Sequence, residues 1–260
     1  MKLDFSLRPA SLLSTLGFAA LLSSLAQFAQ AELDSTTAAK LEEALAADNR
    51  PVADKDRDRN RRPLDTLDFF GFSDDMKVLE LVPGGGWYTR LLMPTLADEG
   101  KLYLAIGTGR AEKLTDVPGF SEAEFLDAGG FGERQPSGRF DIAPFSLSVD
   151  DLDLAVTFRN MHNFTKSGRD NMNKAVFDAL KSGGHYGVVD HTRRHMQSDS
   201  RENRRRMDPV LIIKEVEAAG FEFVDYSDLH YRLDDELRYE VGRATVRGNT
   251  DRFTLLFKKP

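Results

Sequence analysis

The chain has 260 residues, of which 41 % are apolar and 30 % charged, and this length supports one large α/β domain or two small ones. It contains no cysteine, which excludes disulfide bonds, a thiolate nucleophile and cysteine-ligated metal centres. A formal net charge of −7 argues against a general nucleic-acid-binding protein.

The first 31 residues have the three-part layout of a secretory signal peptide. Lys2 and Arg8 precede an uncharged, leucine-rich run over Ser11–Leu25, and a small-x-small pattern ends at Ala31. The apolar run is shorter than the roughly twenty residues that a membrane-spanning helix needs. We therefore expect cleavage after Ala31, a periplasmic or secreted protein, and no stable membrane insertion of the mature chain.

Residues 32–62 predict an N-terminal helix followed by a charged arm. Ser35 can cap a helix over Thr36–Ala47. Residues 48–62 are almost wholly polar with alternating charges, which favours a solvated arm over a binding surface. A short helix from Pro63 to Phe70 then begins the main domain, residues 63–260.

Short apolar runs alternate with amphipathic stretches along the main domain. The apolar runs predict strands over 77–82, 102–106, 124–127, 152–158, 186–189, 221–226 and 252–257. The amphipathic stretches predict helices over 87–96, over 171–180 with residues 181–184 ending it, and from Asp208-Pro209 to Gly220. Strands separated by helices of this length indicate a parallel sheet covered on both faces. The predicted fold is therefore a doubly wound, Rossmann-like α/β fold preceded by a short helical segment.

A glycine-rich turn connects the first predicted strand to the following helix. Its sequence is Val82-Pro83-Gly84-Gly85-Gly86. Ligands of doubly wound sheets bind at the carboxyl ends of the strands, where glycine lets the backbone approach closely and the helix N-terminus presents free N–H groups. A tight turn without a ligand would have the same glycines, so the context of the turn has to support a binding role.

The pattern Glu80-x-x-x-Gly84-x-Gly86 resembles the first motif of class I S-adenosylmethionine-dependent methyltransferases. From about Pro51 to Pro260 the chain is similar to a family of exported methyltransferases. The segments that carry this resemblance are 83–89, 159–164, 187–191 and 250–253. It implies a seven-stranded sheet with a reversed last hairpin and a bound S-adenosylmethionine.

By this resemblance, Gly84 and Gly86 would pass beneath the methionine part of the cofactor, and Glu80 would orient the loop or meet the ammonium group. The other cofactor-binding candidates are Pro83, Gly85, Tyr88 and Asn160. The expected activity is methyl transfer to a small molecule.

Two positions depart from the family pattern. Val82 takes the place of the first glycine, and the second strand ends in residues 105–108 (Ala-Ile-Gly-Thr) without the acidic residue that usually binds the ribose hydroxyls. Thr108 or a later residue can substitute for that carboxylate. Both departures favour an alternative, a non-catalytic periplasmic ligand-binding protein on a methyltransferase-like scaffold.

Three candidate catalytic residues follow the ends of predicted strands. A neutral His162 can accept a proton from a hydroxyl substrate during methyl transfer, although a structural role is at least as well supported. Asp190 and His191 end the next strand and are expected in the polar rim of a cleft. With His195 they could hold a metal in a hydrolase, but the two arginines between the histidines disfavour a dication, and we expect no metal.

A basic island lies between the Asp190 strand and the next helix. Its arginines are Arg193, Arg194, Arg201, Arg204, Arg205 and Arg206. Guanidinium groups suit an anionic substrate, whereas arginines in a polar loop are more often solvated or paired with nearby acidic residues. The island is therefore a candidate wall of the substrate cleft, with an anionic small molecule as its expected partner.

Overall fold

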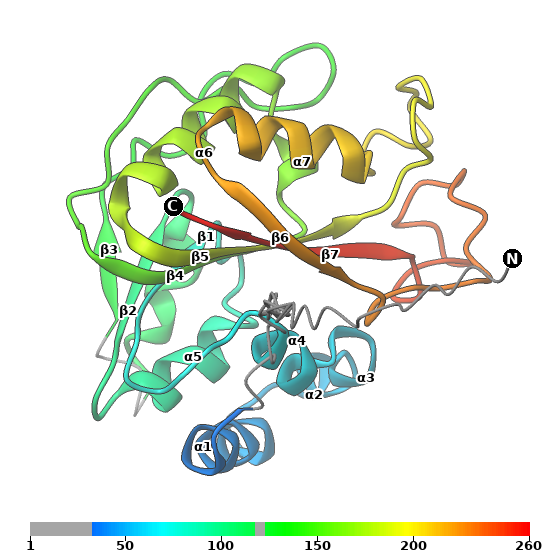
Figure 1. Ribbon diagram of the computed structural model, residues 1–260. Coiled ribbons are helices and arrows are strands. Elements are labelled where there is room, and N and C mark those ends of the chain that lie inside the picture. Colours follow the sequence, from blue (N-terminus) through cyan, green and yellow to red (C-terminus); the bar gives the residue numbers. More distant parts are fainter. Residues whose placement is uncertain (1–32, 118–122) are drawn as a thin grey trace, which may run out of the picture.

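The computed structural model describes residues 33–117 and 123–260, so the expected signal peptide lies outside the described residues. The described chain forms one seven-stranded sheet with helices on both faces (Figure 1). Its strands are β1 Lys77–Leu81, β2 Lys101–Ala105, β3 Glu124–Leu126, β4 Leu152–Phe158, β5 Leu180–His191, β6 Glu222–Ser227 and β7 Arg252–Lys258. The doubly wound α/β fold is thereby confirmed.

Seven α-helices and three short 3-10 helices are present in the described ranges. The α-helices are α1 Ser35–Ala46, α2 Val52–Lys55, α3 Asp58–Arg61, α4 Pro63–Phe69, α5 Thr89–Leu96, α6 Lys166–Ala179 and α7 Pro209–Ala218. The 3-10 helices are η1 Thr108–Arg110, η2 Glu112–Leu114 and η3 Met161–Asn163. None of the helices in this part of the chain is long and apolar enough to cross a bilayer.

The strand order is β3-β2-β1-β4-β5-β7-β6, and only β7 runs antiparallel to its neighbours. The chain builds the sheet outward from β1 in one direction and then from β4 in the other. The winding therefore reverses between β1 and β4, where ligands of such sheets bind. Because β7 is reversed, its first residue Arg252 lies opposite His191, the last residue of β5.

The two faces of the sheet bury separate apolar cores, as the alternation of side chains along each strand requires. In β1, Leu79 belongs to the core under α6 and α7, and Val78 belongs to the core under α1, α4 and α5 (Figure 1). A buried ion pair joins α6 to α7: Arg169 Nε lies 2.6 Å and Nη2 2.8 Å from the Glu215 carboxylate, and Nη1 donates to the Phe164 carbonyl.

Two expectations about single elements need correction. Asp34, not Ser35, caps α1, because its carboxylate accepts from the backbone N–H groups of Thr36 and Thr37. The glycines at 183 and 184 do not end a helix region, since β5 begins at Leu180 and runs through them. A glycine is needed further along the same strand as well: a Cβ at Gly187 would lie 2.6 Å from the Phe70 ring that packs there.

Candidate functional site

The strands β1, β2 and β4 end in the same unusual way. The residue after each has a positive φ: Val82 at 54°, Ile106 at 65° and Arg159 at 63°. L-residues rarely adopt this left-handed conformation, and a β-branched side chain makes it costlier. Such strain is held where the surrounding structure fixes it, often at functional sites. Each of these residues turns the chain away from the sheet at its carboxyl edge.

The glycine loop after β1 uses its three glycines differently. Gly84 and Gly86 have φ values of 61° and 76°, which glycine adopts without cost. A Cβ at Gly86 would lie 2.4 Å from Leu114 Cδ1, whereas a Cβ at Gly85 would meet nothing within 4 Å. Gly86 is therefore needed for packing, while Gly85 leaves open space beside the loop.

Glu80 holds a buried carboxyl group beneath this loop. Thr89 at the start of α5 donates a hydrogen bond of 2.6 Å to it. Burial raises the pKa of Glu80 to about 7, against the lowering effect of this hydrogen bond. The carboxyl group therefore gains or loses a proton near neutral pH and responds to any charge placed beside it.

A cavity of about 300 Å³, here termed the glycine-loop cavity, opens where the winding of the sheet reverses. It is lined by six of the seven predicted cofactor-binding residues: Glu80, Pro83, Gly84, Gly85, Tyr88 and Asn160. Gly86, the seventh, does not line the cavity and packs closely against Leu114. Asn160 donates hydrogen bonds of 3.1 Å to the carbonyls of Val82 and Phe158, which ties the ends of β1 and β4 together.

The charged arm is part of this cavity and not a solvated linker, which corrects the expectation from its composition. Asp54 and Arg61 line the cavity. The Arg61 guanidinium lies 4.2 Å from the centre of the Trp87 ring, and Trp87 Nε1 donates to the Asp54 carbonyl at 3.0 Å. Burial, followed by repulsion from Arg159, lowers the pKa of Arg61 to about 9.

A second cavity, of about 430 Å³, lies beyond the end of β2. No carboxylate stands in residues 105–108, but Glu112 from η2 lines this cavity and accepts a hydrogen bond of 2.6 Å from Thr108. An acidic side chain is therefore present beside β2, supplied by the following 3-10 helix and not by the strand.

The three predicted catalytic residues form one connected group. His162 Nδ1 lies 2.7 Å from Asp190 Oδ1, and Asp190 also accepts from the backbone N–H groups of His162 and His191. Asp190 is fully buried, so it anchors η3 to the end of β5. His162 lines none of the cavities described for this protein.

His191 joins this group through its backbone N–H, while its side chain has a different partner. Its Nδ1 lies 2.8 Å from Thr250 Oγ1, and the ring lines a further cavity. Burial, followed by the nearby Arg252, lowers the pKa of His191 well below its ordinary value, so the imidazole is neutral at physiological pH. His195 takes no part, because its Nδ1 pairs with Asp208 at 2.9 Å, and the described residues form no group of three metal-ligating side chains.

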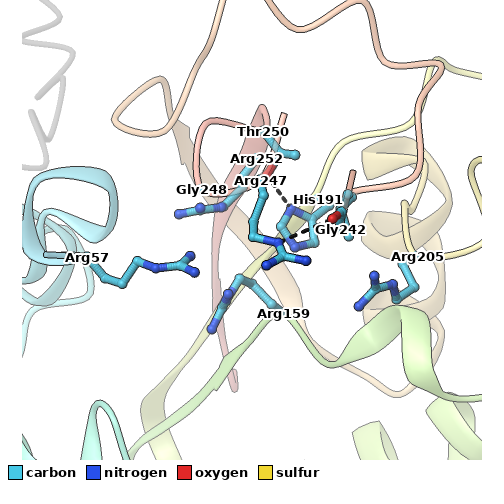
Figure 2. Close-up of a pocket in the computed structure, with 10 residues that line it drawn as sticks. Arg57, Arg159, His191, Arg205, Gly242, Arg247, Gly248, Thr250 and Arg252 are labelled. Carbon is cyan, nitrogen blue, oxygen red and sulfur yellow. Dashed lines mark hydrogen bonds between the residues drawn. The ribbon is translucent and has the colours of Figure 1, made fainter. Parts of the chain in front are cut away.

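The cavity beside His191 has a volume of about 350 Å³ and is here termed the arginine cavity. Figure 2 shows guanidinium groups gathered around the His191 ring. The charged residues that line the cavity are Arg57, Arg159, Arg205, Arg247 and Arg252. They come from the arm, the end of β4, the loop before α7, the loop before β7 and β7 itself, which are separate in the sequence.

Of the basic island, only Arg205 reaches this cavity. Arg193 pairs with Asp199, and Arg194 is exposed. Arg206 is fully buried and bidentate to Asp235, at 2.9 Å and 3.0 Å, and Asp235 also accepts from the N–H groups of Leu237 and Asp251. The backbone of Arg204 accepts from Arg139. Most of the arginine cavity is thus built by residues that lie outside the island.

No protein-family model matches the sequence, and no curated protein matches it. Solved structures do share its fold. A SAM-dependent methyltransferase from Aquifex aeolicus matches with a TM-score of 0.55 at 14 % identity, over 84 % of this chain and 96 % of that one. The glycopeptide N-methyltransferase MtfA with sinefungin matches at 0.51 and 14 %, over 86 % and 96 %. The [4+2]-cyclase SpnF matches at 0.54 and 15 %, over 86 % and 93 %.

At these identities the likeness establishes the fold: a Rossmann-like fold of the kind found in class I S-adenosylmethionine-dependent methyltransferases. SpnF is named for a different chemistry on a similar fold, so the fold by itself does not determine the reaction.

Proposed function

We propose that this protein is an exported class I S-adenosylmethionine-dependent methyltransferase that acts on a small molecule. The observation that carries the proposal is the glycine-loop cavity, which lies at the reversal of the sheet and is lined by Glu80, Gly84 and Gly85. Similar solved structures include methyltransferases, one of them in complex with sinefungin.

The residues of the glycine-loop cavity fit the methionine part of this cofactor, which is an amino-acid zwitterion. Carboxyl groups of Asp54 and Glu80 can receive the ammonium group, and guanidinium groups of Arg61 and Arg110 can receive the carboxylate. Because Gly85 has no side chain, its backbone leaves room for the ligand. Glu112 in the cavity beyond β2 is the side chain that we assign to the ribose hydroxyls.

When bound, S-adenosylmethionine supplies a methyl group on a sulfonium, and the electron pair of the broken C–S bond stays on sulfur. The work left to the chain is to position the acceptor and to receive its proton. We assign proton acceptance to the neutral His191, whose Nε2 is free of hydrogen bonds to the described residues while Nδ1 is held by Thr250. Asp190 and His162 position this strand end through their hydrogen bonds.

The alternative is a ligand-binding protein without catalytic activity. The strained Val82 in place of glycine and the absence of a carboxylate directly after β2 favour it. Cofactor binding separates the two functions, because the alternative scaffold has lost or replaced the cofactor.

The test is thermal unfolding of the purified chain with S-adenosylmethionine or S-adenosylhomocysteine. A ligand at a hundredfold its Kd stabilises the folded state by about 2.7 kcal/mol, which raises Tm by roughly 5–10 °C at this chain length. Gly85→Val should keep the ligand-free Tm and abolish the shift, because its side chain would stand in open space beside the loop. Ala39→Val, on the exposed face of α1, is the matched control.

No shift with either ligand would overturn the proposal. The export part is tested separately, by sequencing the N-terminus of protein recovered from the periplasm or medium, where a mature chain beginning at Glu32 is expected.

A further inference from the structure

The arginine cavity is a positive site in a negative protein. Of the residues that the structure describes, five arginines and no aspartate or glutamate line it, although the whole chain carries a formal charge of −7. Arg205 is paired with Glu240, which lies outside the lining. Four guanidinium groups, those of Arg57, Arg159, Arg247 and Arg252, have no carboxylate within ion-pair distance among the described residues.

Two of these guanidinium groups, those of Arg159 and Arg252, are desolvated by the fold, whereas Arg57 is half-buried and Arg247 is exposed. Arg252 is 6 % exposed, and within the described parts of the chain its Nε is buried without a hydrogen-bond partner and its Nη1 donates only to the Asn60 carbonyl. Burial, followed by repulsion from Arg159, lowers the pKa of Arg252 to about 10, and burial also lowers the pKa of Arg159. Unpaired, partly desolvated guanidinium groups that repel one another are stabilised by a bound anion.

The arginine cavity adjoins the glycine-loop cavity. Arg159 lines both, and Arg57 belongs to the same arm as Asp54 and Arg61 of the glycine-loop cavity. A ligand among the arginines would therefore lie next to a ligand held by the glycine loop. His191 lines the arginine cavity with its neutral ring, where it can meet a hydroxyl group of that ligand (Figure 2).

We infer that the arginine cavity is the acceptor site and that the acceptor is a small molecule with at least two anionic groups, phosphate or carboxylate. The guanidinium fork binds either group in a bidentate manner. The volume of about 350 Å³ suits a small molecule and not a folded partner. The acceptor role rests on the proposed methyltransferase function, whereas the binding of a polyanion can be measured by itself.

A bound polyanion would also help the proposed proton transfer. Arg252 and Arg159 are among the groups that lower the pKa of His191. Anionic groups between these arginines and the ring would offset their effect and make the imidazole a stronger base once the acceptor is in place.

The inference is tested by calorimetric titration of the purified chain with pyrophosphate, with citrate and with acetate, and separately with S-adenosylhomocysteine. Pyrophosphate and citrate represent the two anion chemistries, and acetate carries a single charge. Arg57→Gln and Arg247→Gln should each weaken polyanion binding about tenfold to a hundredfold, because each removes a charge-assisted contact. Arg194→Gln, an exposed arginine outside the cavity, should change it less than twofold.

Whichever of pyrophosphate and citrate binds identifies the anion, and S-adenosylhomocysteine should bind together with it. If S-adenosylhomocysteine binds and neither polyanion does, the inference is overturned and the proposed function stands. Displacement of S-adenosylhomocysteine by the polyanion, or equal affinity in all three variants, would also overturn it. If a polyanion binds with the expected dependence on Arg57 and Arg247 but S-adenosylhomocysteine does not bind, the methyltransferase and acceptor roles fail and only the polyanion site remains.

Discussion

Two buried arginine–carboxylate pairs among the described residues should respond differently when both partners are replaced by apolar residues. Arg169–Glu215 joins α6 to α7, and among the described residues the carboxylate of Glu215 accepts only from Arg169. Arg206–Asp235 is equally buried, but Asp235 also accepts from two backbone N–H groups, those of Leu237 and Asp251. Replacement of Arg206 and Asp235 therefore leaves two backbone N–H groups without their acceptor, whereas replacement of Arg169 and Glu215 leaves, in the described part of the chain, no N–H group that had donated to the carboxylate.

The expected magnitudes follow from those contacts. Glu215→Leu or Asp235→Leu alone leaves a buried guanidinium without its counter-charge, which costs about 3–5 kcal/mol and lowers Tm by roughly 6–20 °C. Arg169→Met with Glu215→Leu should return to within about 2 kcal/mol of the natural protein, because a well-packed apolar pair is often neutral. Arg206→Met with Asp235→Leu should remain destabilised by about 2–6 kcal/mol, since two buried N–H groups lose their acceptor.

Urea unfolding followed by circular dichroism, on each single and double variant, measures both cycles. The loop of Asp235 forms a wall of the arginine cavity through Val241, Arg247 and Thr250, so pyrophosphate binding provides a second readout for that pair. Equal recovery of the two double variants would refute the reasoning that the backbone contacts of Asp235 distinguish the pairs.

Three further predictions concern single positions. Gly86→Ala should lower the free energy of unfolding by about 1–3 kcal/mol, from its φ of 76° and the contact with a leucine methyl group, whereas Gly85→Ala should leave it nearly unchanged in thermal unfolding. The pKa of Glu80 is raised to about 7, so the stability that its protonated carboxyl group contributes is fully present below pH 4.5 and is lost as pH rises to 7. In Glu80→Gln the free energy of unfolding should therefore fall by about 3 kcal/mol less over this pH range than in the natural protein. Burial lowers the pKa of His230 to about 4, so the stability that its neutral ring contributes is present above pH 6.5 and is lost as pH falls to 4. In His230→Gln the free energy of unfolding should fall by about 3 kcal/mol less over this acid range. Urea unfolding at a series of pH values measures both variants, and an unchanged pH dependence in either one would contradict its pKa assignment.

The parts of the site that lie close together in the sequence were accessible to prediction. The strand, glycine loop and helix over residues 77–96 occupy one continuous segment, so the spacing of Glu80, Gly84 and Gly86 indicates both the fold and the cavity. The carboxyl ends of β4 and β5 could be predicted as well, because each lies within one continuous apolar segment. His162 and Asp190 then meet because parallel strands end at one edge of the sheet.

The arginine cavity could not be predicted in this way, because its residues come from segments with no local signal in common. The alternating charges of the arm are typical of a solvated surface, yet Arg50 pairs with Asp58 and Arg61 lies over Trp87. For the packing of the arm, the one signal available was Trp87, the only tryptophan of the chain, which directly follows the glycines and lies under Arg61; it lines the glycine-loop cavity and gives no indication of the arginine cavity. Gly183 and Gly184 were misassigned because their sequence is typical of a helix end, whereas β5 runs through them and the Gly183 N–H donates to the carbonyl of Lys259, which is distant in the sequence.

The reversed strand β7 gives the carboxyl edge of the sheet two regions with different chain connections. At β1, β2 and β4 the chain only leaves the sheet at this edge, and the glycine-loop cavity lies between the ends of β1 and β4. At β5 and β7 one segment leaves and another arrives, because the connection over residues 228–251 enters β7 at this edge. If the proposed acceptor site is correct, mutation or exchange of that loop would change the acceptor without altering the glycine loop, so this is the segment to randomise in a search for new specificities.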